Sequence, residues 1–315
     1  MTGNLPAVVL TVRAGAPPEG TDVADAVTTE WPFAGYTFAP GEPVVLFIHG
    51  YNNPHAEARY KYAIFRYLVH QLGVTTPVAE FHWPGNQHWG YLSFACYPLA
   101  IEPAVASGRK LAHWMQAAGP AARFFAVTHS MGGRVLAETV NELRRLGALD
   151  RLLGACLMAA AVRVDKVADG TLGPQPGEPV RWRVLYSDHD QVLQYAFPIG
   201  QTSGGDGFFP SAVGRAGEPA AKWDGFEAAG YDHGYYWFGG KPDAKASDDQ
   251  TQPLAAPIVD TAPTEPGDGV SPGSVAEFLG FAPPHNLPAA PGPAGHALAT
   301  NTLVASAIGG HQLAS

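Results

Sequence analysis

The chain has 315 residues, of which 46% are hydrophobic, and a formal net charge of −9. The acidic balance argues against nucleic acid as a partner, because no basic run is available to neutralise phosphates. No apolar run reaches the roughly 18 residues of a membrane span, and the N-terminus lacks a basic region and a long apolar region typical of signal peptides. We therefore expect a cytoplasmic protein without a membrane partner, and the sequence leaves its oligomeric state open.

Apolar runs of strand length alternate with helical patterns along the chain. The runs that predict strands are residues 7–13, 33–38, 44–48, 77–83, 124–128, 154–162 and 180–186. Helical spacing follows three of them, to about residue 71, over about 103–118 and up to Gly147. Asn53 and Pro54 predict the start of the first helix, as its cap and first helical residue. This alternation is typical of a mostly parallel sheet with helices on both faces.

Residues 241–315 differ in composition from the rest, being rich in proline. Only residues 271–280 and 297–308 have the pattern of helices there. Of the two cysteines, Cys156 lies in an apolar run and is expected in the core, whereas Cys96 lies in an aromatic loop. Nothing in this spacing indicates a disulfide.

Ser130 occupies the turn between a predicted strand and a predicted helix, within the run THSMGG at residues 128–133. Such a turn pushes the serine hydroxyl above the edge of the sheet, and small residues must flank it because two backbones approach each other there. Gly132 meets that requirement on the far side, while Thr128 stands where the G-x-S-x-G pattern has its first glycine. We interpret Ser130 as a nucleophile.

A serine nucleophile requires a histidine base and an acid that orients the histidine. The strand at 180–186 is followed by two carboxylates, Asp188 and Asp190, and we favour Asp190 because it precedes a short predicted helix. Asp188 remains the alternative, and either could simply cap a helix. The base is expected to be His233, which follows the acid in a loop of small residues; His189 lies too close to the acids to serve.

Acyl transfer also requires donors that stabilise an oxyanion. We expect these to be the backbone N–H groups of Met131, next to the nucleophile, and of Tyr51, in the turn after the strand at 44–48. His49, in the same turn, is expected to brace it. Aromatic and polar side chains near these positions are candidates for a substrate pocket, namely His129, Trp83, Trp89 and Tyr235.

Three motifs together, FIHGYNN at 47–53, FHWP at 81–84 and THSMG at 128–132, resemble the α/β-hydrolase superfamily of serine esterases and lipases. In this form they are similar to a little-characterised bacterial branch of it. The resemblance covers about residues 40–240. It implies the α/β-hydrolase fold and hydrolysis of small-molecule carboxylic esters through an acyl-enzyme, with no cofactor. The chain would then comprise a catalytic domain, 1–240, and a partly helical C-terminal appendage, 241–315.

Other activities use the same residues. A thioesterase, an amidase or peptidase, and an acyltransferase would require the same serine, histidine and acid. A hydrolase-fold binding protein without chemistry would normally lack one of the three. A metal hydrolase is disfavoured, because no histidine pair has a metal-ligand spacing such as H-x-x-x-H. Since no long apolar segment resembles a lipase lid, short-chain or aromatic esters are the expected substrates.

Overall fold

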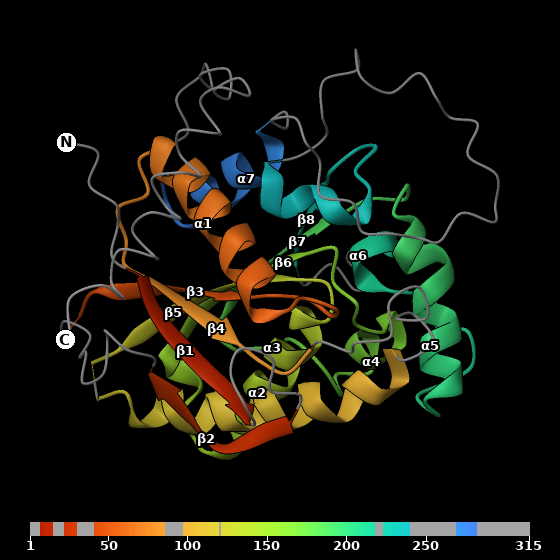
Figure 1. Cartoon of the computed structure of the whole chain (residues 1–315), viewed down its shortest axis with the longest axis horizontal. Coiled ribbons are helices and arrows are strands. Elements are labelled where there is room, and N and C mark those ends of the chain that lie inside the picture. Colours follow the sequence, from red (N-terminus) through yellow and green to blue (C-terminus); the bar gives the residue numbers. More distant parts are fainter. Residues whose placement is uncertain are drawn as a thin grey trace, which may run out of the picture.

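A computed structural model describes residues 7–14, 22–29, 41–85, 97–119, 121–217, 223–239 and 269–281. Its centre is an eight-stranded sheet with the order β2-β1-β4-β3-β5-β6-β7-β8 (Figure 1). The strands are β1 (Ala7–Ala14), β2 (Asp22–Thr29), β3 (Pro43–Ile48), β4 (Val78–His82), β5 (Arg123–His129), β6 (Leu152–Met158), β7 (Arg181–Tyr186) and β8 (Asp224–Glu227). Among the strand pairs of this described part, β1–β2 alone is antiparallel. The predicted mostly parallel sheet is confirmed.

Helices cover the two faces of this sheet. On one face α2 (Ile101–Ala117) packs against α3 (Gly132–Arg145), and on the other α1 (His55–Gln71) packs against α7 (Val270–Phe278) (Figure 1). Shorter helices are α4 (Val164–Ala168), α5 (Phe197–Ser203), α6 (Val213–Ala216), η2 (Leu149–Arg151), η3 (Val192–Ala196) and η4 (His233–Phe238). Most of them surround the carboxyl edge of the sheet, where parallel sheets carry their sites.

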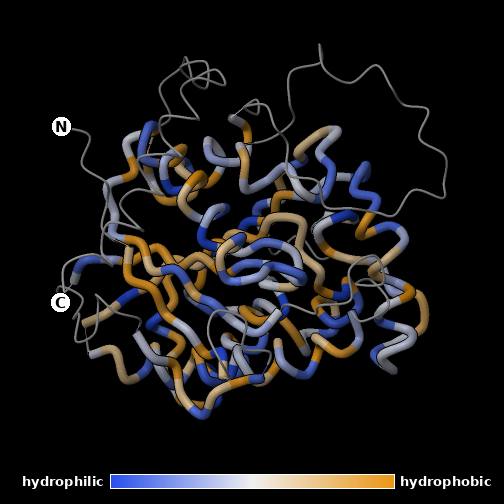
Figure 2. Tube along the Cα trace, viewed as in Figure 1, coloured by the Kyte–Doolittle hydropathy of each residue, from blue (hydrophilic) through white to orange (hydrophobic). Residues whose placement is uncertain are grey.

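The central strands are buried on both sides. β3 and β5 lie next to each other, and five of the six residues of β3 are buried. Figure 2 shows hydrophobic stretches running through the middle of the molecule. Strands covered by helices on both faces need apolar side chains in every direction, which is why these segments are continuous apolar runs rather than alternating ones.

The predicted strand at 154–162 is too long. β6 ends at Met158, and Ala159 takes a positive φ of 46°. Beyond it the backbone turns away from the sheet, and the N–H of Ala161 donates to the carbonyl of Ser130. The apolar residues of this stretch are buried by the turn at Ser130 and by α6, not by a neighbouring strand.

The N-terminal edge also differs from the prediction. The weaker strand at 33–38 lies outside the described residues, whereas β2, which the sequence pattern misses, pairs with β1. β2 is half-buried, and its small apolar residues alternate poorly with polar ones. Pairing with a neighbour, rather than its own hydrophobicity, therefore defines this strand.

The helix predicted at 271–280 is confirmed as α7, which packs on the same face as α1. Val275, Ala276 and Phe278 are buried there. The second helix, predicted at 297–308, and the proposed boundary at 240/241 lie outside the described residues, so the two-part division stays a prediction. In the part of the chain that the structure describes, no helix has the length and hydrophobicity to cross a bilayer.

Candidate active site

Ser130 lies at the turn between β5 and α3, as predicted. It is one of few non-glycine residues with a positive φ, 54°. Three backbone hydrogen bonds of 3.0 Å fix the turn. The N–H of Ser130 donates to the carbonyl of Met158, and the carbonyl of Ser130 accepts from the N–H groups of Gly133 and Ala161. A strained conformation of this kind persists only where surrounding contacts over-determine it. The turn therefore holds the Ser130 hydroxyl in a set position.

Gly132 is required by the close approach of two backbones. A Cβ at this position would lie 2.5 Å from the carbonyl oxygen of Ile48 and 2.6 Å from that of His49. Gly50 has the reciprocal constraint, since its Cβ would lie 2.7 Å from Cβ of Ser130. The turn after β3 and the turn after β5 are thus in van der Waals contact.

His233 and Asp190 lie beside Ser130 and complete a hydrogen-bond network. The Ser130 Oγ is 2.8 Å from Nε2 of His233, and Nδ1 of His233 is 2.7 Å from Oδ2 of Asp190. A carboxylate can only accept, so Nδ1 carries the proton and Nε2 is left to accept from the serine hydroxyl. The other Asp190 oxygen accepts from the N–H of Leu193 at 2.9 Å. All three side chains are buried, Asp190 completely.

The two candidate acids occupy different environments. Asp188 is exposed, with 67% of its side chain accessible, and lies 3.6 Å from His189, which is equally exposed. Asp190 is the carboxylate that contacts His233. His233 starts η4 rather than a loop, and Asp232 caps that helix by accepting from the N–H of His233 at 2.8 Å. Burial raises the pKa of Asp232, and the neighbouring Asp190 carboxylate raises it further.

His129 has a contact that the sequence does not reveal. Its ring is buried, and Nε2 donates to the backbone carbonyl of His233 at 2.7 Å. The two imidazole rings are 4.8 Å apart. A residue of β5 thereby holds the backbone of η4, so that the positions of Ser130 and His233 depend on the same side chain. Its placement is that of a support between the two elements.

The turn after β3 is built around a neutral histidine. His49 is fully buried; its Nδ1 donates to the carbonyl of Gly50, and its Nε2 accepts from the N–H of Trp83. Burial, aided by the Arg13 guanidinium, holds the pKa of His49 well below its ordinary value. The expectation that His49 braces this turn is confirmed by these contacts.

Asn53 belongs to the same turn. The prediction that it caps α1 is wrong. Its amide donates to the carbonyls of Gly50 and Tyr51, at 3.2 and 2.8 Å, and its oxygen accepts from Lys61. Pro54 precedes the first helical residue, and no side chain caps the helix. The amide oxygen, which a capping asparagine would use to accept from the helix N–H groups, accepts instead from the Lys61 ammonium.

The predicted oxyanion donors flank the serine. Within the described residues, the N–H of Met131 has no backbone or side-chain acceptor. Tyr51 follows Gly50 in the turn that touches Ser130, and its ring packs edge-on against Tyr97 with centroids 5.8 Å apart. Their role as oxyanion donors stays a prediction.

The remaining pocket candidates have different places. Trp83 is completely buried, stacks on His49 at 5.6 Å and donates its indole N–H to the His49 carbonyl, so it supports the turn rather than lining a pocket. Tyr235 is half-buried near Tyr231. Trp89 lies outside the described residues.

Among the residues that are described, no group of three or more histidine, cysteine or acidic side chains could hold a metal ion.

Similarity to solved structures is low. A cutinase-like protein from Cryptococcus sp. has 18% identity and a TM-score of 0.27 over 40% of this chain, and the match spans 57% of that chain, less than two-thirds of its length. An α/β serine hydrolase without a lid from Xanthomonas campestris has 11% identity and a TM-score of 0.35, over 62% and 74% of the two chains. Carboxyl esterase 2 from the mycorrhizal fungus Tuber melanosporum has 13% identity and a TM-score of 0.34, over 62% of this chain and 69% of that chain. Similarities this low carry no argument about function.

A family model gives a clearer assignment. No functionally curated protein matches the chain significantly. The model described as "Alpha/beta hydrolase of unknown function (DUF900)" matches residues 34–203, which include Ser130 and Asp190 and leave His233 beyond the matched range. This match covers more than half of the chain, and the sheet order and helix layers agree with it. The protein is therefore a member of this family of α/β hydrolases.

Proposed function

We propose that the protein is a serine carboxylesterase that hydrolyses short-chain or aromatic carboxylic esters through an acyl-enzyme. The observation that supports this most is the hydrogen-bond network of Ser130, His233 and Asp190, with distances of 2.8 and 2.7 Å. A serine hydroxyl is a weak nucleophile, and a histidine bonded to it can accept its proton as attack begins. Because Asp190 is buried, solvent screens its attraction to the resulting imidazolium only weakly.

The proposed reaction has two steps. Oγ of Ser130 attacks the ester carbonyl carbon while its proton passes to Nε2 of His233; the C–O bond to the alcohol then breaks, and the alcohol leaves with that proton. Water, deprotonated by the same nitrogen, next attacks the acyl carbon; the bond from this carbon to Oγ of Ser130 then breaks, Oγ takes the proton back from Nε2, and the carboxylic acid leaves. The N–H groups of Met131 and Tyr51 are the proposed donors to the oxyanion of both tetrahedral intermediates. Losing one such donor typically costs about 3–4 kcal/mol.

The first test is hydrolysis of p-nitrophenyl esters of increasing acyl length. Ser130→Ala should lower kcat by several orders of magnitude, because nucleophile and base act as a unit. Ser107→Ala is a matched control, since Ser107 is also buried but lies in α2, and its hydroxyl has no partner within the described residues. A fluorophosphonate probe should label Ser130 in the wild type. Labelling of another serine, or full activity of Ser130→Ala, would contradict the proposal.

The role of the acid has its own matched pair. Asp190→Asn should preserve the fold but reduce kcat by about 10⁴, since an amide no longer fixes the tautomer of His233. Asp188→Asn should leave kcat unchanged, because Asp188 is exposed and its ion-pair partner is the equally exposed His189 rather than His233. A larger loss for Asp188→Asn than for Asp190→Asn would refute the assignment. Thioester and amide substrates with the same acyl groups measure how far the activity is specific to oxygen esters.

A further inference from the structure

A second site lies beyond the residues of the proposed reaction. A pocket of about 100 Å³ opens between η3, the first turn of α5, and α6. Its walls include the apolar Leu193, Pro198 and Phe209 and the polar Gln194, Ser211 and Arg215. Ser130, His233 and Asp190 are not among the residues that line it. The pocket therefore lies beside these three side chains rather than among them, and it shares Leu193, whose N–H donates to Asp190, with the hydrogen-bond network described above.

Arg215 has no counter-charge in this pocket. Its Nε is shielded from solvent without a hydrogen-bond acceptor, and within the described part of the chain its guanidinium forms no ion pair. Nearby arginines differ, since Arg134 and Arg163 are each paired with carboxylates. Arg215 as a whole is half-buried and lines the pocket, so it presents a cationic group without a counter-charge from the described residues to an anion bound there.

The surroundings of the pocket are apolar and exposed. Phe209, which lines the pocket, has 58% of its surface accessible, and the adjacent Phe208 has 84%. The rings of Phe208 and Phe209 are 5.0 Å apart. Exposed apolar side chains that gather around a pocket mark an interaction site more often than scattered ones do. The cationic Arg215 and the exposed ring of Phe209, which line the same pocket, together fit an anionic head with a hydrocarbon chain.

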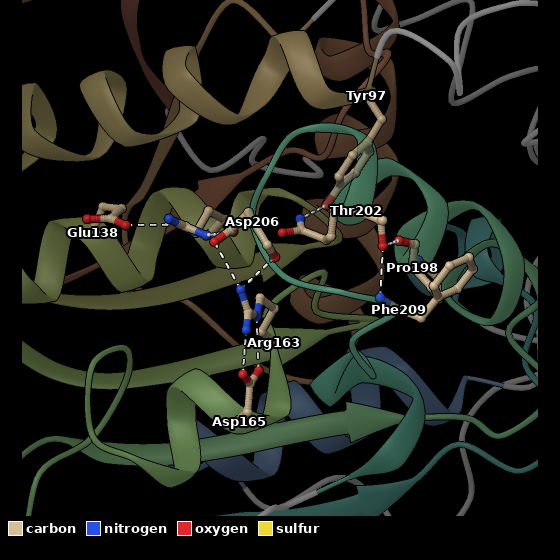
Figure 3. Close-up of polar contacts among 10 residues, drawn as sticks. Tyr97, Glu138, Arg163, Asp165, Pro198, Thr202, Asp206 and Phe209 are labelled. Atoms are coloured by element: carbon tan, nitrogen blue, oxygen red, sulfur yellow. Dashed lines mark hydrogen bonds and ion pairs between the residues drawn. The ribbon is translucent and has the colours of Figure 1, made fainter.

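The wall that carries Phe209 is held in place without a ligand. Figure 3 shows that Thr202 connects Pro198 and Phe209, accepting from the N–H of Phe209 and donating to the carbonyl of Pro198, both at 2.8 Å. Asp206 is held between Arg163, at 3.1 Å, and Arg134, at 3.0 Å. A wall that is ordered beforehand loses little entropy when a ligand binds.

We propose that this pocket binds an organic monocarboxylate with an apolar chain, whose carboxylate accepts from Arg215 and whose first methylenes contact Pro198 and Phe209. The size of the pocket accommodates the head and the start of the chain, and the rest of the chain lies along the exposed ring of Phe209. The binding does not depend on hydrolysis, so its test is separate from that of the esterase proposal.

Titration calorimetry with sodium octanoate should show one site per chain. Acetate, which lacks the chain, and 1-octanol, which lacks the charge, should each bind at least about tenfold more weakly, since a charge-assisted hydrogen bond and a buried chain are both required. Arg215→Gln should weaken octanoate at least about tenfold without lowering the melting temperature, because it removes an unsatisfied donor. Arg109→Gln, which removes an exposed arginine of α2, should bind octanoate like the wild type.

Phe209→Ala is the second variant. It shortens the apolar wall but keeps the backbone bond to Thr202, so octanoate should weaken several-fold while acetate should not change. Equal affinity of octanoate for Arg215→Gln and the wild type would overturn the proposal. So would binding of 1-octanol as tight as that of octanoate, which would mark an apolar surface without selectivity for the anion.

Discussion

At the residue scale, His129 connects the strand that carries the proposed nucleophile with the helix that carries the proposed base. Its bond to the His233 carbonyl fixes the backbone rather than the reacting imidazole. A small displacement of a catalytic base is enough to lower the rate strongly, although the residue itself touches no substrate. We therefore regard His129 as a positioning residue for the proposed reaction.

His129→Leu should lower kcat for ester hydrolysis by about 100-fold and leave KM nearly unchanged, because His233 is no longer held. His129→Gln, whose side-chain amide can still donate to the His233 carbonyl, should recover most of the loss. Thr128→Val is the neighbouring control, since its buried hydroxyl has no partner within the described residues. Equal losses for His129→Leu and His129→Gln would show that volume, not the hydrogen bond, matters.

His49 makes stability depend on pH. Because its pKa in the folded state lies well below the ordinary value, the unfolded chain takes up a proton that the folded chain does not. Its contribution is complete above about pH 6.5 and is lost as the pH falls from there towards the folded-state pKa. Urea unfolding at pH 7.5 and pH 5.5 should show this decline, at up to about 1.4 kcal/mol per pH unit from this group.

Two variants isolate the effect of His49. His49→Asn should have a shallower dependence of the unfolding free energy on pH, whereas its absolute stability should fall because Trp83 loses a partner. His189→Gln should keep the slope of the wild type, since 70% of the His189 side chain is exposed. The same slope in all three proteins would mean that other groups cause the decline.

At the element scale, α7 is bound to the sheet mainly through Phe278. The ring packs edge-on against Phe125 with centroids 6.2 Å apart, and the Arg181 guanidinium lies over it at 5.2 Å. Gly154 leaves room for it, because a Cβ there would lie 2.8 Å from the ring. A residue far along the chain thus fills a space that a strand of the sheet provides.

Phe278→Ala should lower the free energy of unfolding by about 3–5 kcal/mol, the usual cost of removing a buried phenylalanine. Glu277→Ala, the adjacent change, should cost no more than about 1 kcal/mol, because this carboxylate is 59% exposed and its bond to Arg183 is long, 3.4 Å. Both values can be measured by denaturant unfolding. Similar values for the two variants would show that α7 contributes little to the fold.

The elements that the sequence predicts well are those whose own composition requires burial. β3 is a continuous apolar run, β4 and β7 are mostly apolar, and each is found within about a residue of the expected bounds. β2 escapes prediction because its pairing with β1 is a long-range contact that its own residues do not encode. The turn at 159–162 is wrongly predicted as part of a strand, because a run of apolar residues is compatible both with a buried strand and with a packed turn.

The same distinction applies to the candidate site. The place of Ser130 follows from a local pattern, strand, turn and helix, which the sequence contains in full. The choice of Asp190 over Asp188 depends on which of the two side chains faces His233. Both lie on one turn, so the sequence alone does not reveal this direction. The contact of His129 with His233 joins residues 104 positions apart, so no local signal could have indicated it.

At the scale of the whole molecule, the C-terminal part contributes to a core formed by the rest. Arg183 of β7 donates to the carbonyl of Ser274, and Ser271 donates to the carbonyl of Tyr236 in η4. η4 begins with His233, so α7 lies directly behind the helix that carries the proposed base.

A chain that ends at Lys241 should therefore melt at a lower temperature than the full chain, because α7 and its buried contacts are lost. A chain that ends at Gly309 keeps α7 and should melt like the full chain. Differential scanning calorimetry measures both, and fluorophosphonate labelling shows whether Ser130 still reacts in the shorter chain. Equal melting temperatures for the chain ending at Lys241 and the full chain would contradict the role assigned to α7.

The two edges of the sheet bear on how the molecule behaves at high concentration. Within the described residues, β2 forms one edge and exposes Asp22 and Asp25, and the four-residue β8 forms the other and exposes Asp224 and Glu227. Unpaired strand edges invite pairing with another chain, and charges on a short edge oppose it. Side-by-side pairing of two copies, at like or at unlike edges, would bring carboxylates of both together. These charges therefore oppose edge-to-edge aggregation, in which the sheet of one molecule would continue into the next.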